Sequence, residues 1–221
     1  MKDPALRVLI SIQPNPHRSL IIQRNANLST AFPLRESILK FLEEYRFDGI
    51  ELDWPTAAQD WSQFKILLKL IGAPLAKRGY TLAVALTPED PVDLELLPIV
   101  DLIILKSWRV QLACASCGRT EYPVLHPGPL SFIVQNTSKW VEQVSAGQRS
   151  KFVLAIPIFG QRYTLKFSNL TDVGTLVQKS GKEGVYTKLR DGKLAYYEVK
   201  YHVNTKKKSL VALIGILVKN K

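Results

Sequence analysis

The sequence contains few of the residues that build metal centres and disulfide frameworks. Of its 221 residues, two are cysteine and three are histidine. A zinc site needs about four ligands, and His17, His126 and His202 are not spaced to join Cys114 and Cys117 in one site. We therefore expect no metal and no cofactor. Either the two thiols close a tight loop disulfide, or one of them pairs with sequence outside this chain.

A leader peptide and long apolar runs are also absent. The apolar run over residues 210–218 is far shorter than the roughly 20 residues of a membrane-spanning helix, so no membrane segment is expected. Met1-Lys2-Asp3-Pro4 leads directly into an apolar strand and leaves no room for a signal peptide. Either the protein is cytosolic or the beginning of its sequence is missing.

Acidic residues are outnumbered, with 30 basic and 19 acidic residues and a net charge of +11. Such an excess raises the question of nucleic acid or an anionic surface. The basic residues are scattered, however, and the only tight cluster is Lys206-Lys207-Lys208, a run typical of a solvated stretch. We therefore expect no nucleic-acid partner.

The apolar residues follow the rhythm of a parallel α/β sheet, in which short apolar runs alternate with longer amphipathic stretches. Apolar residues at helical spacing predict helices over residues 34–45 and 61–75. The polar run Asn136-Thr137-Ser138 predicts the start of another helix, followed by a strand over residues 152–158.

The rhythm changes after about residue 166 to short segments separated by turns. Arg190-Asp191-Gly192-Lys193 predicts a hairpin that joins strands over residues 185–189 and 194–199. Tyr196 and Tyr197 fall in this region, where we expect them to be packed rather than to contact a ligand.

Residues 47–55, Phe-Asp-Gly-Ile-Glu-Leu-Asp-Trp-Pro, are the most informative segment. The strand period of two puts Glu51, Asp53 and position 55 on one face. Carboxylates on an otherwise buried strand survive only when they are hydrogen-bonded, paired or used, so the pattern predicts a site. The alternative is a strand end with solvated acids. Trp54 alternates away from Asp53, and we expect it in the core, together with Trp61 and Trp140.

This segment resembles the signature strand of family-18 glycoside hydrolases, the chitinases and chitinase-like lectins, whose pattern is Asp-Gly-x-Asp-x-Asp-Trp-Glu-Tyr-Pro. Four residues match it: Asp48, Gly49, Asp53 and Trp54. Glu51 stands in for the second Asp of the pattern. The Glu and Tyr before the proline are absent, because Trp54 runs directly into Pro55. In that family the missing Glu is the general acid.

The resemblance extends over roughly residues 7–200. Segments similar to the family's strands are residues 7–12, 81–87, 100–109 and 151–165, and residues 184–199 resemble its insertion domain. The implied fold is α/β, an incomplete (β/α)8 TIM barrel with part of an α+β chitinase insertion domain. The implied divisions are residues 1–165, partial barrel, residues 166–203, partial insertion domain, and residues 204–221, a divergent tail. Since a complete barrel usually needs about 250 residues, we expect strands at both ends to be missing.

The resemblance also implies a degraded catalytic site. Asp48, Glu51 and Asp53 are remnants of the motif, no catalytic residue is intact, and Pro55 follows where the acid is missing. The family's Met-Thr-Tyr-Asp, whose Tyr and Asp hold the sugar's acetamide, corresponds to Lys106-Ser107-Trp108-Arg109. Phe159-Gly160-Gln161 similarly replaces Tyr-Gly-Arg. The candidate ligand-binding residues are Asp53, Trp108 and Phe159.

Strand alternation places Lys106 on the side to which Glu51 and Asp53 point. An ammonium there needs a counter-ion, so we predict an ion pair with Asp53 or Glu51. The alternative is that Lys106 reaches out of the open barrel into water.

The function implied by the resemblance is that of a chitinase-like pseudoenzyme of carbohydrate metabolism, which binds chitin or chitooligosaccharides. Two alternatives are a residual chitin hydrolase that uses another carboxylate, and a truncated product without independent activity. The resemblance implies an extracellular location, and three glycosylation sequons, at Asn27, Asn136 and Asn169, fit a secreted glycoprotein. Other chains are expected to cover the open barrel edges, and no membrane or nucleic acid is expected as a partner.

Overall fold

The computed structural model describes eleven stretches of the chain: residues 6–13, 28–54, 60–87, 90–107, 122–123, 130–167, 169, 172, 174–188, 193–199 and 211–212. The chain divides into two compact units. The first contains residues 1–106 and 134–155, and the second contains residues 107–133 and 156–221. Within the described residues, no helix combines the length and apolar character that crossing a membrane requires.

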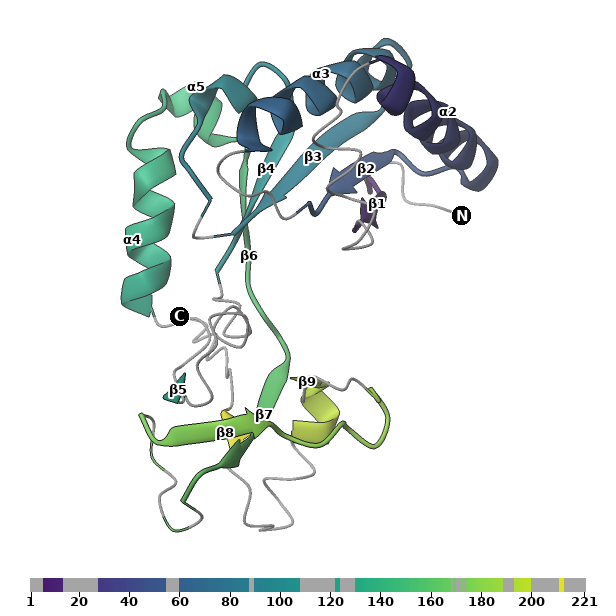
Figure 1. Cartoon of the computed structure of the whole chain (residues 1–221). Coiled ribbons are helices and arrows are strands. Elements are labelled where there is room, and N and C mark those ends of the chain that lie inside the picture. The colour runs from purple at the N-terminus through teal and green to yellow at the C-terminus, as the bar shows by residue number, and fades with distance from the viewer. Residues whose placement is uncertain are drawn as a thin grey trace. The chain divides into compact units, whose positions relative to one another are not determined.

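A five-stranded parallel sheet forms the centre of the first unit, with the strand order β1-β2-β3-β4-β6 (Figure 1). Its strands are β1 (Leu9–Ile12), β2 (Gly49–Leu52), β3 (Thr81–Leu86), β4 (Leu102–Lys106) and β6 (Phe152–Ala155). Each strand falls within a segment that the sequence predicts to be extended. The strand predicted over residues 152–158 is shorter in the structure, where β6 ends at Ala155.

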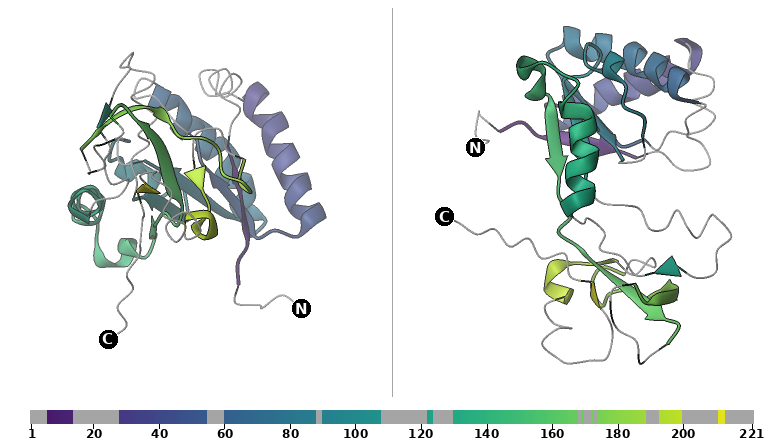
Figure 2. Two further views of the ribbon diagram at one scale, coloured as in Figure 1. Left: turned by 90° about the horizontal axis from the view of Figure 1, so that it is seen from below. Right: turned by 90° about the vertical axis from the view of Figure 1, so that its left-hand side faces the viewer.

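Two long helices, α2 (Leu28–Tyr45) and α3 (Trp61–Lys77), pack on the same face of this sheet (Figures 1 and 2). Helix α2 begins earlier than predicted and passes through Pro33. Because proline lacks an N–H, it removes one helical hydrogen bond. The Ser37 hydroxyl donates to the Pro33 carbonyl at 2.9 Å, an additional contact in that turn. The core between helices and sheet contains Trp54, Trp61 and Trp140, as predicted.

Among the described residues, shorter helices include η2 (Leu94–Leu96), α4 (Leu130–Val141) and α5 (Ala146–Arg149). The predicted helix start at residues 136–138 is wrong, because these residues lie inside α4. The Asn136 side chain does not act as a cap at the helix start; its Oδ1 accepts a hydrogen bond from Lys139 Nζ at 2.9 Å.

Antiparallel strands form the second unit, in the order β10-β7-β8-β5, with β9 also paired to β7. These strands are β5 (Tyr122–Pro123), β7 (Gly160–Leu165), β8 (Leu176–Ser180), β9 (Lys193–Leu194) and β10 (Val211–Ala212). The predicted hairpin is wrong in its described part. Residues 185–187 form a turn, and residues 196–199 form a helical turn.

A buried carboxylate explains why these segments are turns rather than strands. Glu198 is 3% exposed and accepts hydrogen bonds from the N–H groups of Tyr186, Thr187 and Ala195 and from the Thr187 hydroxyl. These contacts hold both turns around one side chain. Tyr196 and Tyr197 are consequently 63% and 57% exposed, which corrects the expectation that they are packed. The Tyr197 ring contacts Tyr186 edge to face, with centroids 5.7 Å apart.

Candidate functional site

Asp48, the first acid of residues 47–55, aligns the neighbouring strands at the amino end of β2. Asp48 Oδ2 accepts from the Val8 N–H at 2.6 Å, and the Asp48 N–H donates to the Val8 carbonyl at 2.9 Å. The Asp48 carbonyl in turn accepts from the Thr81 N–H at 2.9 Å. A Cβ at Gly49 would lie 2.0 Å from the Thr81 carbonyl oxygen, so only glycine fits beside β3. Ligands of parallel sheets bind at the other end of the strands, so we assign Asp48 a structural role.

At the carboxyl end, three side chains from three strands meet. Lys106, the last residue of β4, donates from Nζ to Asp53 Oδ1, just beyond β2. Gln13, just beyond β1, donates from Nε2 to Asp53 Oδ2 at 2.9 Å. The Lys106 and Asp53 side chains are each 15% exposed. The predicted ion pair is thus confirmed, with Asp53 as the partner.

Small residues on β3 allow this ion pair to form. Strand β3 lies between β2 and β4, so the two backbones are about 10 Å apart and the lysine must extend across β3. The β3 residues on that face are Ala83 and Ala85, which lie outside the core cluster formed with α2 and α3. Ala85 pairs with Ile104, two residues before Lys106 on the same face. A long side chain at position 85 would obstruct the lysine.

Glu51 lies on the same face of β2, one step closer to the amino end. Its register neighbours are Ser11 on β1 and Ala83 on β3, both small. The Glu51 side chain is half-buried. In the part of the chain that the structure describes, its carboxylate has no ion pair and no hydrogen-bond partner. The site therefore contains one neutralised carboxylate, that of Asp53, and one carboxylate without a counter-ion.

Of the remaining predicted site residues beyond β2, the structure describes only Phe159. Pro55 and Trp108 lie outside the described residues. Phe159 belongs to the second unit, where it is half-buried and its ring centroid lies 5.8 Å from Lys193 Nζ, a cation–π distance. Gln13 was not predicted from the sequence. Its place directly after a predicted strand, where side chains of parallel strands converge, is the signal that could have found it.

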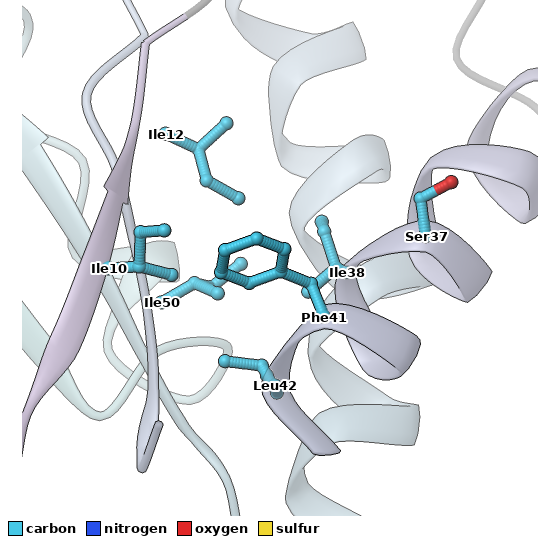
Figure 3. Close-up of a pocket in the computed structure, with 7 residues that line it drawn as sticks. All are labelled: Ile10, Ile12, Ser37, Ile38, Phe41, Leu42 and Ile50. Atoms are coloured by element: carbon cyan, nitrogen blue, oxygen red, sulfur yellow. The ribbon is translucent and has the colours of Figure 1, made fainter. Parts of the chain in front are cut away.

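Two further features of the described residues bear on other kinds of site. No cluster of three or more His, Cys, Asp or Glu side chains there could hold a metal ion. An apolar pocket of about 210 Å³ lies between β1, β2 and α2 on the helix-covered face (Figure 3). It is lined by Ile10, Ile12, Ser37, Ile38, Phe41, Leu42 and Ile50. Because none of these residues is titratable, the pocket offers no acid or base.

Comparison with known sequences points to one family. The family model for Glycosyl hydrolases family 18 matches residues 1–212. The chain is 26% identical over 181 residues to the Drosophila melanogaster protein named "Probable chitinase 10". It is 24% identical over 164 residues to the "Chitinase-like mite allergen Der f 18.0101" of Dermatophagoides farinae. Each alignment covers 74% of this chain, but only 8% and 35% of the respective relative.

Solved structures share the fold. The chain resembles an immunomodulatory active chitinase from Trichuris suis, with a TM-score of 0.73 and 19% identity over 92% of this chain and 60% of that one. It also resembles a class V chitinase from Nicotiana tobaccum in complex with NAG4, with a TM-score of 0.70 and 18% identity over 92% of this chain and 63% of that one. The parallel sheet of the first unit is therefore part of a TIM barrel, as predicted from the sequence.

Proposed function

Because the chain belongs to glycosyl hydrolases family 18, we propose that it is a chitinase-like protein that binds chitin or N-acetylglucosamine oligosaccharides without hydrolysing them. The observation that carries this proposal is the pairing of Asp53 with Lys106 and Gln13. A carboxylate held by an ammonium and an amide N–H has no proton to donate. General acid catalysis contributes roughly 10²- to 10⁴-fold to such reactions, and proline at position 55 cannot supply it.

Sugar binding is supported by the polar groups at the carboxyl ends of the strands. The amide of Gln13 and the ammonium of Lys106 are donors, and the carboxylates of Asp53 and Glu51 are acceptors, so both kinds of partner for sugar hydroxyls and amides are present. Two structural neighbours, the class V chitinase from Nicotiana tobaccum and a chitinase from Cycas revoluta, were solved in complex with NAG4 and (GlcNAc)4. We further propose an extracellular location, with the exposed Asn169 as a glycan acceptor.

A residual hydrolase is the second candidate, and Glu51 is the observation that favours it. Its carboxylate has no counter-ion within the described residues. Glu51 lies on the same face of β2 as Asp53, opposite the face that packs against the helices. In this alternative Glu51 would replace the missing acid.

One assay with two readouts tests both candidates. The purified chain is incubated with a chromogenic chitooligosaccharide and, separately, with chitin beads. We expect retention on the beads and no release of the chromophore. Turnover that disappears in Glu51→Gln would establish the residual hydrolase instead. A chain that folds cooperatively by circular dichroism but is not retained would reject the sugar-binding proposal.

A further inference from the structure

Tyr186 and Tyr197 form an exposed aromatic pair in the second unit. They are 72% and 57% exposed, and their rings meet edge to face, with centroids 5.7 Å apart and an angle of 66° between the ring planes. The neighbouring Tyr196 is 63% exposed. Apolar residues scattered singly over a surface need no explanation, but aromatic rings gathered in one place mark an interaction site.

Buried Glu198 holds the backbone on both sides of this pair. Its carboxylate accepts from the Tyr186 N–H at 2.7 Å and from the Ala195 N–H at 2.9 Å, and Glu198 directly follows Tyr197 in the sequence. A Cβ at Gly184 would collide with this carboxylate, so glycine permits the close approach. An aromatic surface that is fixed before a ligand arrives loses little conformational entropy on binding. The scaffold around the pair therefore favours a binding role.

We propose that Tyr186 and Tyr197 form a second carbohydrate-binding site, which takes a single chitooligosaccharide chain. The choice of ligand rests on the proposed function. The site itself is separate, because Asp53 and Lys106 belong to the first unit. A pyranose ring presents an apolar face of C–H groups and a rim of hydroxyls. Tyrosine matches both, with an apolar ring for stacking and a phenolic O–H for hydrogen bonding.

Size and geometry select a single sugar chain over larger partners. Even with Tyr196 included, three tyrosines offer at most about 750 Å², whereas a stable protein interface buries about 800 Å² on each partner. The 66° between the ring planes also prevents both rings of the pair from lying flat on one planar surface, such as a crystalline chitin face. A flexible oligosaccharide can stack on one ring and bond to the hydroxyl of the other.

The experiment follows the binding of chitotetraose by NMR of the full chain, labelled in its tyrosine rings. Tyr186→Phe and Tyr197→Phe assign the two ring signals. We expect both signals to shift saturably as chitotetraose is added, because a stacked sugar changes the magnetic environment of the ring. The titration uses the unchanged chain, so it decides the proposal even where a variant does not fold.

Substitutions identify the origin of the binding energy. Tyr197→Ala should weaken the binding measured at Tyr186 at least about tenfold, comparable to the loss of aromatic stacking with nucleic-acid bases. Tyr197→Phe keeps the ring and should bind nearly as tightly as the unchanged chain. Tyr45→Ala removes an equally exposed tyrosine, at 57%, from α2 of the first unit and should leave the titration unchanged. Asp53→Ala should also leave it unchanged.

The outcomes separate the second site from the proposed function. Ring signals that do not respond, in a chain that chitin beads retain, overturn the second site and leave the proposed function standing. A response that Asp53→Ala abolishes, or that Tyr45→Ala and Tyr197→Ala weaken equally, also overturns the second site. If the folded chain is not retained and its ring signals do not respond, the proposed function and the second site are rejected together.

Discussion

At the scale of single residues, Gly49 is the described glycine at which an added Cβ would meet the closest neighbour. We expect Gly49→Ala to lower the free energy of unfolding by about 3 kcal/mol, the upper end for overpacking, because the added Cβ meets the backbone of β3 rather than a movable side chain. Chemical denaturation measures the change.

Gly147→Ala is the matched control for this substitution. A Cβ at Gly147 in α5 would have no neighbour within 4 Å, so it should be neutral or slightly stabilising. Equal effects of the two substitutions would contradict the crowding argument.

Alternation along the strands predicted much of the site at this scale. It put Asp53, Glu51 and Lys106 on one face, and the ion pair between Asp53 and Lys106 follows from that placement. Alternation does not show how far a neutral side chain in a connecting segment reaches, so Gln13 was missed. It also does not distinguish a catalytic acid from one that holds strands together, so Asp48 was grouped with the motif although it acts at the opposite end of β2.

At the scale of elements, Glu198 joins the two turns of the second unit. Burial alone would raise the pKa of its carboxyl, but the hydrogen bonds from Tyr186, Ala195 and Thr187 outweigh burial and lower the pKa from 4.5 to about 2. Because the folded pKa lies below the unfolded one, the carboxylate stabilises the fold above about pH 4.5. This stabilisation is lost as the pH falls from there toward about 2.

We expect the N–H groups of Tyr186 and Ala195 to exchange with solvent faster as the pH is lowered through this window, after correction for intrinsic exchange. Glu198→Gln should remove this pH dependence and cost about 1–3 kcal/mol at neutral pH, because a buried donor loses its acceptor. Hydrogen exchange followed by NMR measures both effects. Glu183→Gln, at an exposed position nearby, is the control and should leave both unchanged.

Long periodic elements were predicted more accurately than short ones. The helices over residues 34–45 and 61–75 and the strands of the parallel sheet follow from apolar periodicity, because each buries one face against the same core. The hairpin near residues 190–193 was predicted from local turn residues. A buried carboxylate eight residues away overrides that local preference, and no local pattern encodes it.

At the scale of the whole molecule, β1 and β6 are the edge strands of the first unit's parallel sheet, as far as the described residues show. Strand β6 carries apolar side chains that are exposed, Val153 at 42% and Leu154 at 40%. Unpaired edges with apolar side chains favour association with other chains. We expect the isolated chain to self-associate as its concentration rises, and Leu154→Lys to reduce this association, as measured by light scattering.

Gln135→Lys adds the same charge at an exposed position of α4 and is the control for net charge. It should associate like the unchanged chain. A chain that stays monomeric at high concentration, or equal suppression by both lysine substitutions, would contradict a role for the β6 edge.

The two ends of β2 serve different purposes: residues at one end align the strands, and residues at the other end belong to the candidate site. Asp48 and Gly49 set the strand pairing at one end, while Asp53 meets its partners at the other, and only four residues, Gly49–Leu52, form the strand between them. Replacement of residues beyond Leu52 therefore changes what the surface recognises without disturbing how the strands align. Substitutions that alter ligand recognition can therefore accumulate during evolution with little effect on folding, because ligand recognition and strand pairing depend on different residues.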